Sequence, residues 1–526
     1  MAAISPYATA LELERPRPSH ITNTQDADRV TAYWTYWDVF RNVAEAWEAV
    51  LRDDDGDEVS RRRVPSARTV IEATNRYLAK NPAVVPNPIS VGPDGTEITA
   101  PPETLAQVMK LWGDFAKREE FWSKFISLKR WMLIRGDGLF YVTADDTKPE
   151  GTRLRLEEMD PSTYFTIVDP IDEKRVIGCY IVEIVDDDEG EPIAQRQEYR
   201  KITSEEDAAE FGAAIGTVFT RLTFWEEAGW DDRDDPEALE PVDPPARFGD
   251  SPLLEGFTLP PVIDSLPVYH FRNNREGNLP FGISEIQGIE TLLAGIIQTA
   301  TDEDITITLT GIGVYTTTSG KPRDSQGNEQ EWIIAPASVI ELEGEKDRFD
   351  RVKGVDSVTP LLDHLGMLEG QSLKTTGTPD IAVGSVDVKV AESGIALAIQ
   401  MAPILAKNTE KEMELKTKVD QMLFDLVNKW FVAYEGLNPG GVSLAVMFDN
   451  PLPTDRVATL NEIIQLLGAK IISIAFAQQL VRDRLGISIP ANMLAEIAAE
   501  QAQLLDAVGQ RVDQEAALTP PPRADS

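Results

Sequence analysis

The sequence predicts an α+β chain of several domains. Three observations lead to this prediction: the N-terminal third carries helical stripes, the next part carries short strands, and a β-rich insertion separates two later helices. Helices grouped before strands are typical of α+β architecture rather than of alternating βαβ units. A chain of 526 residues should hold three or four domains, at roughly 150 residues per domain. Hydrophobic residues make up 42% of the chain, which is enough for folded cores.

The N-terminal third should contain three helices. Aromatic side chains recur at steps of three and four residues in Val30–Leu51, which predicts an apolar helical stripe. Pro65 starts a second helix that should end near Ala79. A single long helix is predicted for Pro101–Ile134. It should end at Arg135-Gly-Asp-Gly138, where the second glycine suits a left-handed exit.

Short strands should follow, separated by acidic loops that contain Gly and Pro. The predicted strands are Leu139–Thr143, Tyr164–Val168, Val176–Val185, Gln197–Ile202, Thr217–Trp225 and Val268–Phe271. Cys179 is the single cysteine and lies in one of these apolar runs, so we expect a buried thiol. A single cysteine excludes a disulfide framework and any Cys-rich zinc or iron–sulfur site within this sequence.

A helix is predicted for Ile283–Asp304. Ser284–Gln287 matches a capping box, in which the serine and glutamine side chains satisfy the first amides of a helix. Gly288 and Gly295 are seven residues apart, so they should lie on one side of this helix. A neighbouring element could pack closely there.

A β-hairpin should follow this helix and precede a second one. Ile305–Thr310 alternates strictly between apolar and polar residues, which predicts a strand that continues through Gly311–Thr317. A second β-rich run is expected at Trp332–Leu342. Thr359-Pro360 then starts the second helix, because proline is favoured at the first helical position.

The remaining part should be a loop followed by helices. Thr375–Glu392 has Gly, Pro, Thr and Ser at intervals and no helical stripe, which predicts a mobile loop. A helix should begin at Ser393 and be kinked by Pro403. A strand is predicted for Val442–Phe448. The last predicted helices are Asp455–Leu467, Ile474–Leu485 and Pro490–Val508, before a Pro-rich tail.

The formal net charge is −38, from 88 acidic and 50 basic residues. Because tight nucleic-acid binding depends on Lys and Arg at phosphates, this charge argues against it. A duplex could still pass nearby with weak contact. The acidic runs Asp53–Glu58, Asp186–Glu191 and Glu226–Asp243 are expected to be solvated loops. The longest apolar stretch is Gly394–Ala406, which is too short to cross a membrane.

No pattern for catalysis, a cofactor or a metal is visible. The three histidines, His20, His270 and His364, are far apart and each has an ordinary sequence context. Gly320-Lys321 is followed by proline rather than the Ser or Thr of a phosphate loop. We therefore expect no enzyme activity, no cofactor and no metal. A hydrolase that uses two carboxylates stays a distant alternative.

Four segments carry a resemblance to a known family. They are Arg135–Val142, Pro267–Phe271, Phe281–Ile286 and Ser393–Leu397. In this order, and around a helix–hairpin–helix insertion, they resemble portal proteins of tailed double-stranded DNA bacteriophages. The resemblance covers nearly the whole chain, from about residue 25 to 510.

The resemblance implies a structural channel rather than an enzyme. Portal subunits form a homo-oligomeric ring, normally of twelve, at one capsid vertex of the virion, after assembly in the host cytoplasm. Double-stranded DNA is packaged and ejected through its axis with weak, non-specific contact. The implied partners are terminase, head–tail connector or adaptor proteins, and major capsid and scaffold proteins. No membrane is involved. Another head–tail connector or minor capsid protein is the alternative within this structural class.

The resemblance also implies a multi-domain fold with wing, two-helix stem, β-rich clip and α-helical crown. The implied parts are the wing at 1–282, the first stem helix at 283–304, the clip at 305–356, the second stem helix at 357–374, the tunnel loop at 375–392, the long kinked wing helix and strand at 393–449, the crown at 450–509 and a disordered tail at 510–526.

Candidate functional residues follow from this division. The channel candidates are Lys374, Asp380, Asp387, Lys389 and Glu392. The candidates for docking at the clip are Lys321, Arg323 and Trp332, and the kink is expected at Pro403. The two lysines at the loop could steady a duplex, or they could be ordinary surface residues.

Overall fold

The computed structural model describes residues 24–43, 62–87, 89–91, 97–99, 101–169, 171–172, 175–226, 241–249, 251–275, 280–312, 314–319, 321, 326–327, 329, 346–352, 358–384, 394–449, 456–469, 471, 477 and 480–481. Helices and sheets are both present, which agrees with the α+β prediction. The chain divides into two compact units, Met1–Phe448 and Asp449–Ser526. None of the helices in the described ranges combines the length and apolar character that a membrane span requires.

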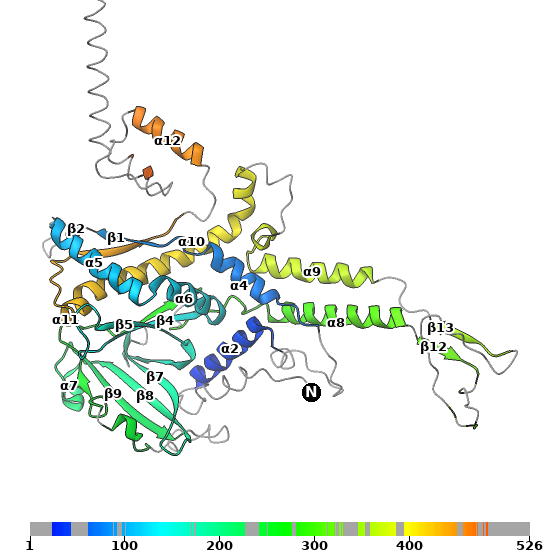
Figure 1. The fold of residues 1–526 in the computed structure, drawn as a ribbon, viewed down its shortest axis with the longest axis horizontal. Helices are drawn as coiled ribbons and strands as arrows, with labels where there is room; N and C mark the ends of the chain where they lie inside the picture. The colour runs from blue at the N-terminus through cyan, green and yellow to red at the C-terminus, as the bar shows by residue number, and fades with distance from the viewer. Residues whose placement is uncertain are drawn as a thin grey trace, which may run out of the picture. The chain divides into compact units, whose positions relative to one another are not determined.

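In the N-terminal part of the first unit, the described residues form four helices (Figure 1). They are α2 (Thr24–Arg41), α4 (Ser66–Tyr77), α5 (Pro102–Arg118) and α6 (Phe121–Arg135). The first predicted helix is confirmed over Val30–Arg41, but it begins at Thr24 and ends before Asn42, which has a left-handed φ of 57°, rather than at Leu51. The second is confirmed at Ser66–Tyr77. The prediction of one long helix at Pro101–Ile134 is wrong, because Glu120 adopts a left-handed conformation with φ of 52° and divides it.

The turn between α5 and α6 has a physical role that the apolar periodicity does not reveal. Glu119 accepts a hydrogen bond from the Leu156 amide at 3.1 Å, and Lys124 donates to the Leu156 carbonyl. Both backbone groups belong to an edge strand of a sheet. The break therefore places charged side chains where they satisfy an edge that would otherwise be free to pair.

Two antiparallel sheets form the β part of the first unit. The strands are β4 (Asp137–Ala144), β5 (Leu154–Met159), β6 (Tyr164–Val168), β7 (Val176–Asp186), β8 (Pro192–Lys201), β9 (Val218–Glu226), β10 (Phe257–Thr258) and β11 (Val268–Arg272). One sheet has the order β10-β9-β8-β7-β6 and the other the order β11-β4-β5. All six predicted strands are found to within a few residues; β5 and β10 are additional. Short helices η2 (Pro161–Thr163), α7 (Glu205–Phe211) and η5 (Ala246–Phe248) lie between strands.

Three further strand pairs are antiparallel. They are β1 (Ala83–Asn87) with β14 (Ser443–Met447), β2 (Ile89–Val91) with β3 (Glu97–Thr99), and β12 (Val314–Thr317) with β13 (Phe349–Val352). The first pair joins the N-terminal part of the chain to the strand predicted at Val442–Phe448. The last pair lies between two long helices.

The later part of the chain is mainly helical. Its elements are α8 (Glu290–Ile312), α9 (Thr359–Thr375), η6 (Asp380–Val383), α10 (Gly394–Asp425), the π-helical turn η7 (Leu426–Trp430), α11 (Phe431–Tyr434) and, in the second unit, α12 (Arg456–Gly468). The α12 helix confirms the helix predicted at Asp455–Leu467. The helices predicted at Ile474–Leu485 and Pro490–Val508 lie almost entirely outside the described residues.

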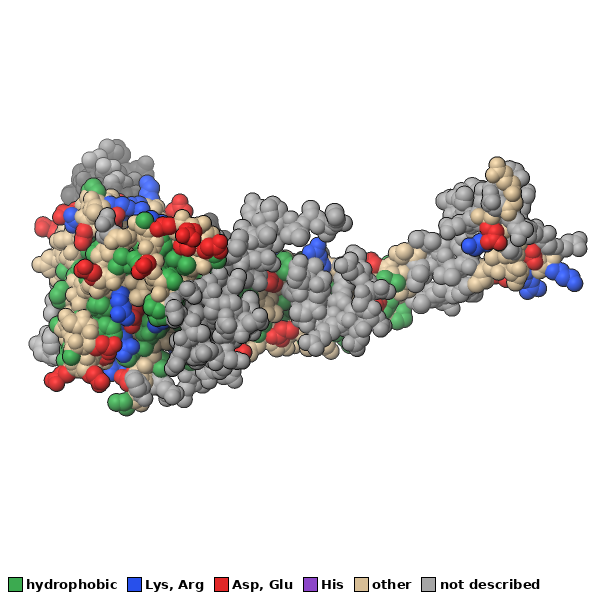
Figure 2. All heavy atoms as spheres, turned by 90° about the horizontal axis from the view of Figure 1, so that it is seen from below, with side chains coloured by type: hydrophobic (Ala, Val, Ile, Leu, Met, Phe, Trp, Pro, Cys, Tyr) green, Lys and Arg blue, Asp and Glu red, His purple; other side chains and the backbone are tan. Residues whose placement is uncertain are grey.

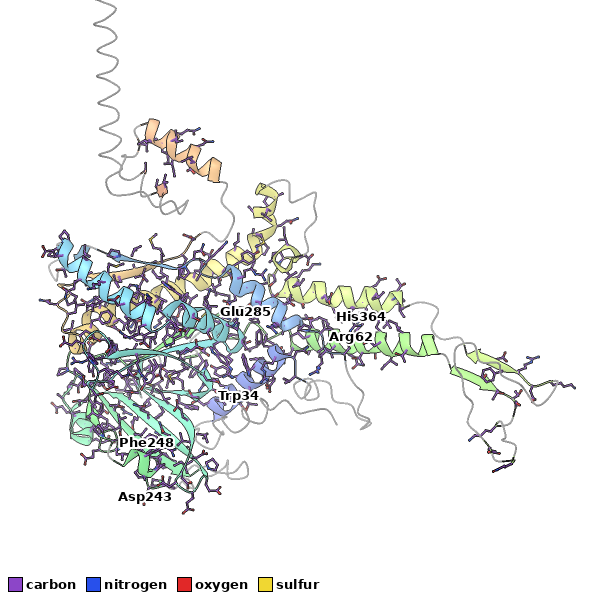
Figure 3. The ribbon with its side chains drawn as sticks, in the orientation of Figure 1. Trp34, Arg62, Asp243, Phe248, Glu285 and His364 are labelled. Carbon is purple, nitrogen blue, oxygen red and sulfur yellow. The ribbon has the colours of Figure 1, made fainter. Side chains whose placement is uncertain are left out.

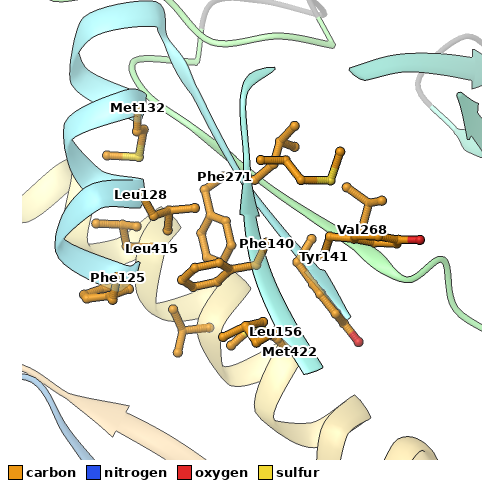
Figure 4. Packing of buried hydrophobic residues seen from close by; sticks show 14 of the residues in the cluster. Phe125, Leu128, Met132, Phe140, Tyr141, Leu156, Val268, Phe271, Leu415 and Met422 are labelled. Carbon is orange, nitrogen blue, oxygen red and sulfur yellow. The ribbon is translucent and has the colours of Figure 1, made fainter. Parts of the chain in front are cut away.

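The main core joins α6, the three-stranded sheet and α10 (Figure 4). Its labelled side chains are Phe125, Leu128, Met132, Phe140, Tyr141, Leu156, Val268, Phe271, Leu415 and Met422. Cys179 is fully buried on β7, as expected, and burial raises the pKa of its thiol. On the face in Figure 2, acidic and basic side chains of the described residues are interspersed with hydrophobic ones.

Candidate functional site

The candidate site is the helix pair α8 and α9 with the hairpin β12–β13 between them in sequence. The two helices lie side by side (Figure 1). A strand pair is present: β12 and β13 pair antiparallel from Val314↔Val352 to Thr317↔Phe349, and β12 lies within the predicted first strand, whereas β13 follows the predicted second one. The β-rich run predicted at Trp332–Leu342 lies outside the described residues.

The strand predicted at Ile305–Thr310 is wrong, because α8 continues through this segment to Ile312. Threonine favours strands only weakly, and a helix can satisfy its hydroxyl internally. Thr308 donates to the carbonyl of Asp304 at 2.8 Å, and Thr301 donates to that of Ile297 at the same distance. Only Ile305 and Leu309 are four residues apart, as on one side of a helix, so the strict alternation points to a strand and the helix overrides it.

The start of α8 also differs from the prediction. The helix begins at Glu290, whose carboxylate accepts the amide of Gly288 at 2.7 Å. Ser284 forms no capping box. Its hydroxyl donates to the carbonyl of Ile134 and accepts the amide of Ile286 at 3.0 Å. This serine therefore ties the chain before α8 to the end of α6.

The two helices pack closely where α8 carries Gly295. A Cβ atom at this position would lie 3.3 Å from Cδ1 of Leu368 on α9, so the glycine allows the close approach that the sequence predicted. Gly288 does not take part, because it precedes the helix with φ of +89° and a Cβ atom there would meet nothing within 4 Å.

The beginning of α8 is buried, whereas its later part exposes apolar side chains. Leu293, Ile296 and Ile297 belong to the main core and are at most 1% exposed. Further along α8, Ile305 and Ile307 are exposed, as are Leu362 and Met367 on α9, each between 42% and 48%. The pair is thus not folded into a compact globule that hides all of its apolar residues.

Three of the four segments that carry the portal resemblance meet at one backbone junction. Gly136 caps α6 in a left-handed conformation with φ of +94°. It lies against Gly282, where a Cβ atom would be 2.2 Å from the Gly136 carbonyl oxygen and 2.5 Å from that of Asn273. The first glycine of Arg135-Gly-Asp-Gly138, rather than the second, therefore makes the left-handed exit.

Asp137 completes this junction. Its carboxylate accepts hydrogen bonds from the Tyr33 hydroxyl and from the Gly282 amide, the latter at 2.9 Å, and it contacts Nε2 of His270 at 2.6 Å. These partners come from α2, from the segment before α8 and from β11. The residues that carry the resemblance thus hold the connection between the sheet and α8. Ser393 lies outside the described residues.

A buried ion network fixes the other side of the same connection. Its central residue, Glu285, is labelled in Figure 3. Glu285, in the segment before α8, accepts hydrogen bonds from Lys407 at 2.8 Å and Lys411 at 2.6 Å, both on α10. The side-chain amides of Asn273 and Asn274 donate to the same carboxylate at 3.2 and 2.9 Å. We call these five residues the Glu285 network.

The Glu285 carboxylate is ionised at neutral pH. Burial by itself would raise the pKa of Glu285, but the ammonium groups of Lys411 and Lys407 outweigh this effect and lower it to about 2. Burial lowers the pKa of Lys411, and the Glu285 carboxylate opposes that shift. Lys411 also donates to Oδ1 of Asn273 at 2.6 Å. A buried ion pair with this many partners is strongly disturbed when one charge is removed.

Lys407 extends the network to two more elements. Its ammonium group donates to the carbonyl of Thr376, just after α9, at 2.8 Å and to the hydroxyl of Thr74 on α4 at 3.2 Å. The segments that precede α8 and follow α9 are therefore both held by one side chain of α10.

The loop predicted at Thr375–Glu392 is partly folded. Residues 376–384 form a turn and the short helix η6, in which Thr378 and Ala382 are nearly fully buried. The η6 helix packs against α4 and α10. The prediction of a mobile loop is wrong for this part, because its threonines and its backbone have partners in the fold; residues 385–393 lie outside the described residues.

The predicted channel residues are placed as follows. Lys374 is exposed in the last turn of α9, and Asp380 is exposed at the first position of η6. Asp387, Lys389 and Glu392 lie outside the described residues. The roles assigned to these residues remain predictions.

The residues predicted for docking and for the kink lie elsewhere. Lys321 is exposed between β12 and β13, whereas Arg323 and Trp332 are outside the described residues. Pro403 lies inside α10, which changes direction along its length (Figure 1). Among the described candidates, Lys321 lies between β12 and β13, whereas Lys374 and Asp380 lie at and beyond the end of α9.

The Glu285 network is not predicted by the sequence. One signal was present: Lys407 and Lys411 are four residues apart on one helix, and such a pair of like charges is unfavourable unless an anion lies near it. The identity of that anion, more than 120 residues away in sequence, was not visible. Among the described residues, no group of three or more His, Cys, Asp or Glu side chains is arranged to hold a metal ion.

No protein-family model and no curated protein matches this chain. Solved structures resemble it at low identity. One is a chain in "Neck of native GTA particle computed with C12 symmetry", with 12% identity, a TM-score of 0.38, and coverage of 80% of this chain and 89% of the other. Another comes from "Virion of native gene transfer agent (GTA) particle", with 11% identity, a TM-score of 0.37, and coverage of 81% and 91%. Because both TM-scores are below 0.5, the proposals below are based on the residues of this chain.

Proposed function

We propose that this chain is a portal-like subunit: identical copies close into a ring around a channel for double-stranded DNA, at a vertex of a phage-type particle. The observation that carries the proposal is the anchored helix pair α8–α9, which has a β-hairpin between its helices and apolar side chains exposed along it. The proposed role is structural and involves no catalysis.

The exposed apolar residues of the helix pair favour a ring. Ile305 and Ile307 on α8 and Leu362 on α9 face solvent in the single subunit. Removing apolar surface from water is favourable by about 25 cal/mol per Å². Neighbouring copies in a head-to-tail arrangement that closes into a ring would cover such side chains on every subunit.

The charge of the chain suits a channel that does not retain DNA. A duplex carries about one negative charge per 1.7 Å, so a strongly basic channel would hold it by releasing counterions. A net charge of −38 per subunit opposes such binding. Repulsion acts only within the Debye length of about 8–10 Å. The DNA would therefore move with weak contact, driven by a separate packaging ATPase.

The hairpin β12–β13 is the proposed docking element. It would bind terminase during packaging and a head–tail connector afterwards, and Lys321 is an exposed residue in the connection between its strands. Lys374 and Asp380, near the end of α9, are the described candidates for the channel side.

The proposal is tested by the assembly state of the purified chain. We expect rings with a central hole in electron micrographs, and a mass of about 700 kDa for twelve subunits of 58.2 kDa by mass photometry. The rings should also bind the packaging ATPase in a pull-down. A stable monomer at micromolar concentration, with no rings, would refute the proposal. Rings that do not bind the ATPase would favour a head–tail adaptor instead.

A further inference from the structure

The centre of the Glu285 network brings an amine, a carboxylate and a side-chain amide into contact. Nζ of Lys411 lies 2.6 Å from Oδ1 of Asn273 and 2.6 Å from Oε1 of Glu285. The same Oε1 accepts a hydrogen bond from Nδ2 of Asn273 at 3.2 Å. One carboxylate oxygen is therefore bonded to both the nitrogen of the amine and the nitrogen of the amide. An ion pair alone requires no amide at this place.

These three side chains are buried and held in position. Asn273 is 0% exposed, Lys411 4% and Glu285 7%. The backbone of Asn273 donates to the carbonyl of Gly136 at 2.7 Å and accepts the amide of Ile283 at 2.8 Å. Reacting groups that are fixed at contact distance can reach effective concentrations of about 10⁵ M or more. The geometry therefore favours a reaction between the amine and the amide.

Lys411 has the surroundings of a nucleophilic lysine. A lysine is activated when it is desolvated or lies beside another cation. Burial lowers the pKa of Lys411, and the nearby ammonium group of Lys407 lowers it as well, although the Glu285 carboxylate opposes the shift. Lys407 itself donates to a carboxylate, to a backbone carbonyl and to a hydroxyl, and no side-chain amide is among these partners.

We propose that Lys411 and Asn273 form an isopeptide bond, with Glu285 as the group that transfers the proton. In the ion pair, one proton moves from Lys411 to Glu285 and leaves a neutral amine. The amine attacks Cγ of Asn273, and a new C–N bond forms. The bond between Cγ and Nδ2 then breaks, and Nδ2 leaves as ammonia with the proton of Glu285.

The atoms and charges of this step balance within the site. The surplus proton of the attacking amine converts the ammonia to ammonium, and Glu285 returns to its carboxylate form beside Lys407. Nζ must move from the plane of the amide to a position above Cγ, which is one bond beyond Oδ1, and the flexible lysine chain allows this. The reaction happens once in each chain and is not enzymatic turnover, so a small population of the neutral pair is sufficient.

Asn274 is the competing target. Lys411 also donates to Oδ1 of Asn274, and Nδ2 of that residue donates to Glu285 at 2.9 Å. Asn274 is exposed, however, so its amide is hydrated, whereas that of Asn273 is shielded from water. The proposed bond would join the end of β11 to α10 across 138 residues of the chain. It does not depend on the proposed ring.

Mass spectrometry of the purified full chain in denaturant tests the proposal. We expect a mass lower than that of the sequence by one ammonia molecule. A tryptic digest should contain a branched peptide that joins Lys411 to Asn273. A wild-type mass equal to that of the sequence would overturn the proposal, whatever the variants below show. A branch at Asn274 would overturn the choice of Asn273.

Two lysine variants identify the source of the lost ammonia. An asparagine that cyclises on its own backbone also releases ammonia, but this reaction needs no lysine. Lys411→Arg should therefore have the full mass of its sequence. Lys416→Arg is the matched control, because Lys416 is also on α10 and donates to the carbonyl of Val446. It should keep the loss. Loss of ammonia from Lys411→Arg would contradict the isopeptide bond.

Glu285→Gln tests the proton transfer. This variant should keep the full mass of its sequence, because glutamine cannot accept the proton of Lys411. A thiol reagent serves as the check of folding, since Cys179 is fully buried in the folded chain. A full mass together with a protected thiol supports the role of Glu285. Loss of ammonia to the wild-type extent in Glu285→Gln would exclude that role.

Discussion

Replacing Glu285 by glutamine should loosen the connection between the sheet and α8. Glutamine keeps the size of the side chain and one acceptor oxygen, but it leaves Lys407 and Lys411 without a counter-charge in a buried place. The pKa of Glu285 is lowered from 4.5 to about 2. At about 1.4 kcal/mol per unit, this shift corresponds to roughly 3 kcal/mol. Removing one partner of a buried ion pair typically costs about 3–5 kcal/mol, which is consistent with that value.

Hydrogen–deuterium exchange measures this effect locally, which suits a chain too large for a two-state analysis. The amide of Glu285 donates to the carbonyl of Leu133 at 2.9 Å, and that of Ile283 donates to Asn273 at 2.8 Å. Opening of this segment breaks the Glu285 network. A loss of about 3 kcal/mol should therefore speed exchange of these amides by roughly 100-fold. Glu369→Gln, on the exposed side of α9, is the matched control and should change nothing.

The effect should also depend on pH. Because the pKa of Glu285 is lower in the folded state, its stabilisation is complete above about pH 4.5 and is lost as the pH falls toward 2. The difference in thermal unfolding between the wild type and Glu285→Gln should therefore be largest near pH 7 and vanish near pH 2. Equal behaviour of the Glu285 and Glu369 variants at pH 7, or a difference that persists at pH 2, would refute the reasoning.

Two further predictions concern the close approach of Gly282 to Gly136 and the buried thiol of Cys179. Gly282→Ala should abolish soluble expression, because its Cβ atom would lie 2.2 Å from the carbonyl oxygen of Gly136. Gly366→Ala on α9 is the control, since a Cβ atom there meets nothing within 4 Å. It should leave the free energy of unfolding of the subunit unchanged or raise it by up to about 1 kcal/mol. Western blotting of soluble fractions and thermal unfolding distinguish the two. Cys179 should resist a thiol reagent in the folded chain and react fully in denaturant, because it is buried and its thiol pKa is raised; rapid reaction in buffer would contradict this.

Elements with a clear local pattern could be predicted from the sequence. Tyr164–Val168 was found with its predicted bounds, and β4, β7 and β9 differ by one or two residues at an end. Their alternating apolar residues agree with the burial in the sheets. The helix α9 was also located correctly, because proline at its first turn and leucines along one side point to the same structure.

Two segments whose local sequence pattern points to the wrong structure could not be predicted. The segment Ile305–Thr310 alternates like a strand, yet α8 continues through it. The apparent capping box at Ser284 fails because this hydroxyl bonds to Ile134, about 150 residues away in the chain. At Ser284 a contact with a distant segment overrides the local pattern. At Ile305–Thr310 the alternation misleads because the helix satisfies the Thr308 hydroxyl from within, at the Asp304 carbonyl.

The same distinction applies to the candidate site. The motif Arg135-Gly-Asp-Gly138 is visible in the sequence, but its structural role is not. That role depends on Gly282, which allows the two backbones to approach closely. The Glu285 network joins residues from three segments, each of which is unremarkable by itself. The channel candidates Asp387 and Lys389 were inferred from the family resemblance and lie outside the described residues.

The polar character of the Glu285 network indicates what it would contribute to a subunit of the proposed ring. Apolar packing at this position could provide similar stability, because desolvation offsets much of the gain from a buried ion pair. Hydrogen bonds with defined partners, however, hold α10, the start of α8 and the end of α9 at one relative position. In a closed ring, a small angular error in each subunit is repeated in every copy and prevents closure. A network that fixes geometry is therefore more useful at the base of this helix pair than one that only adds stability.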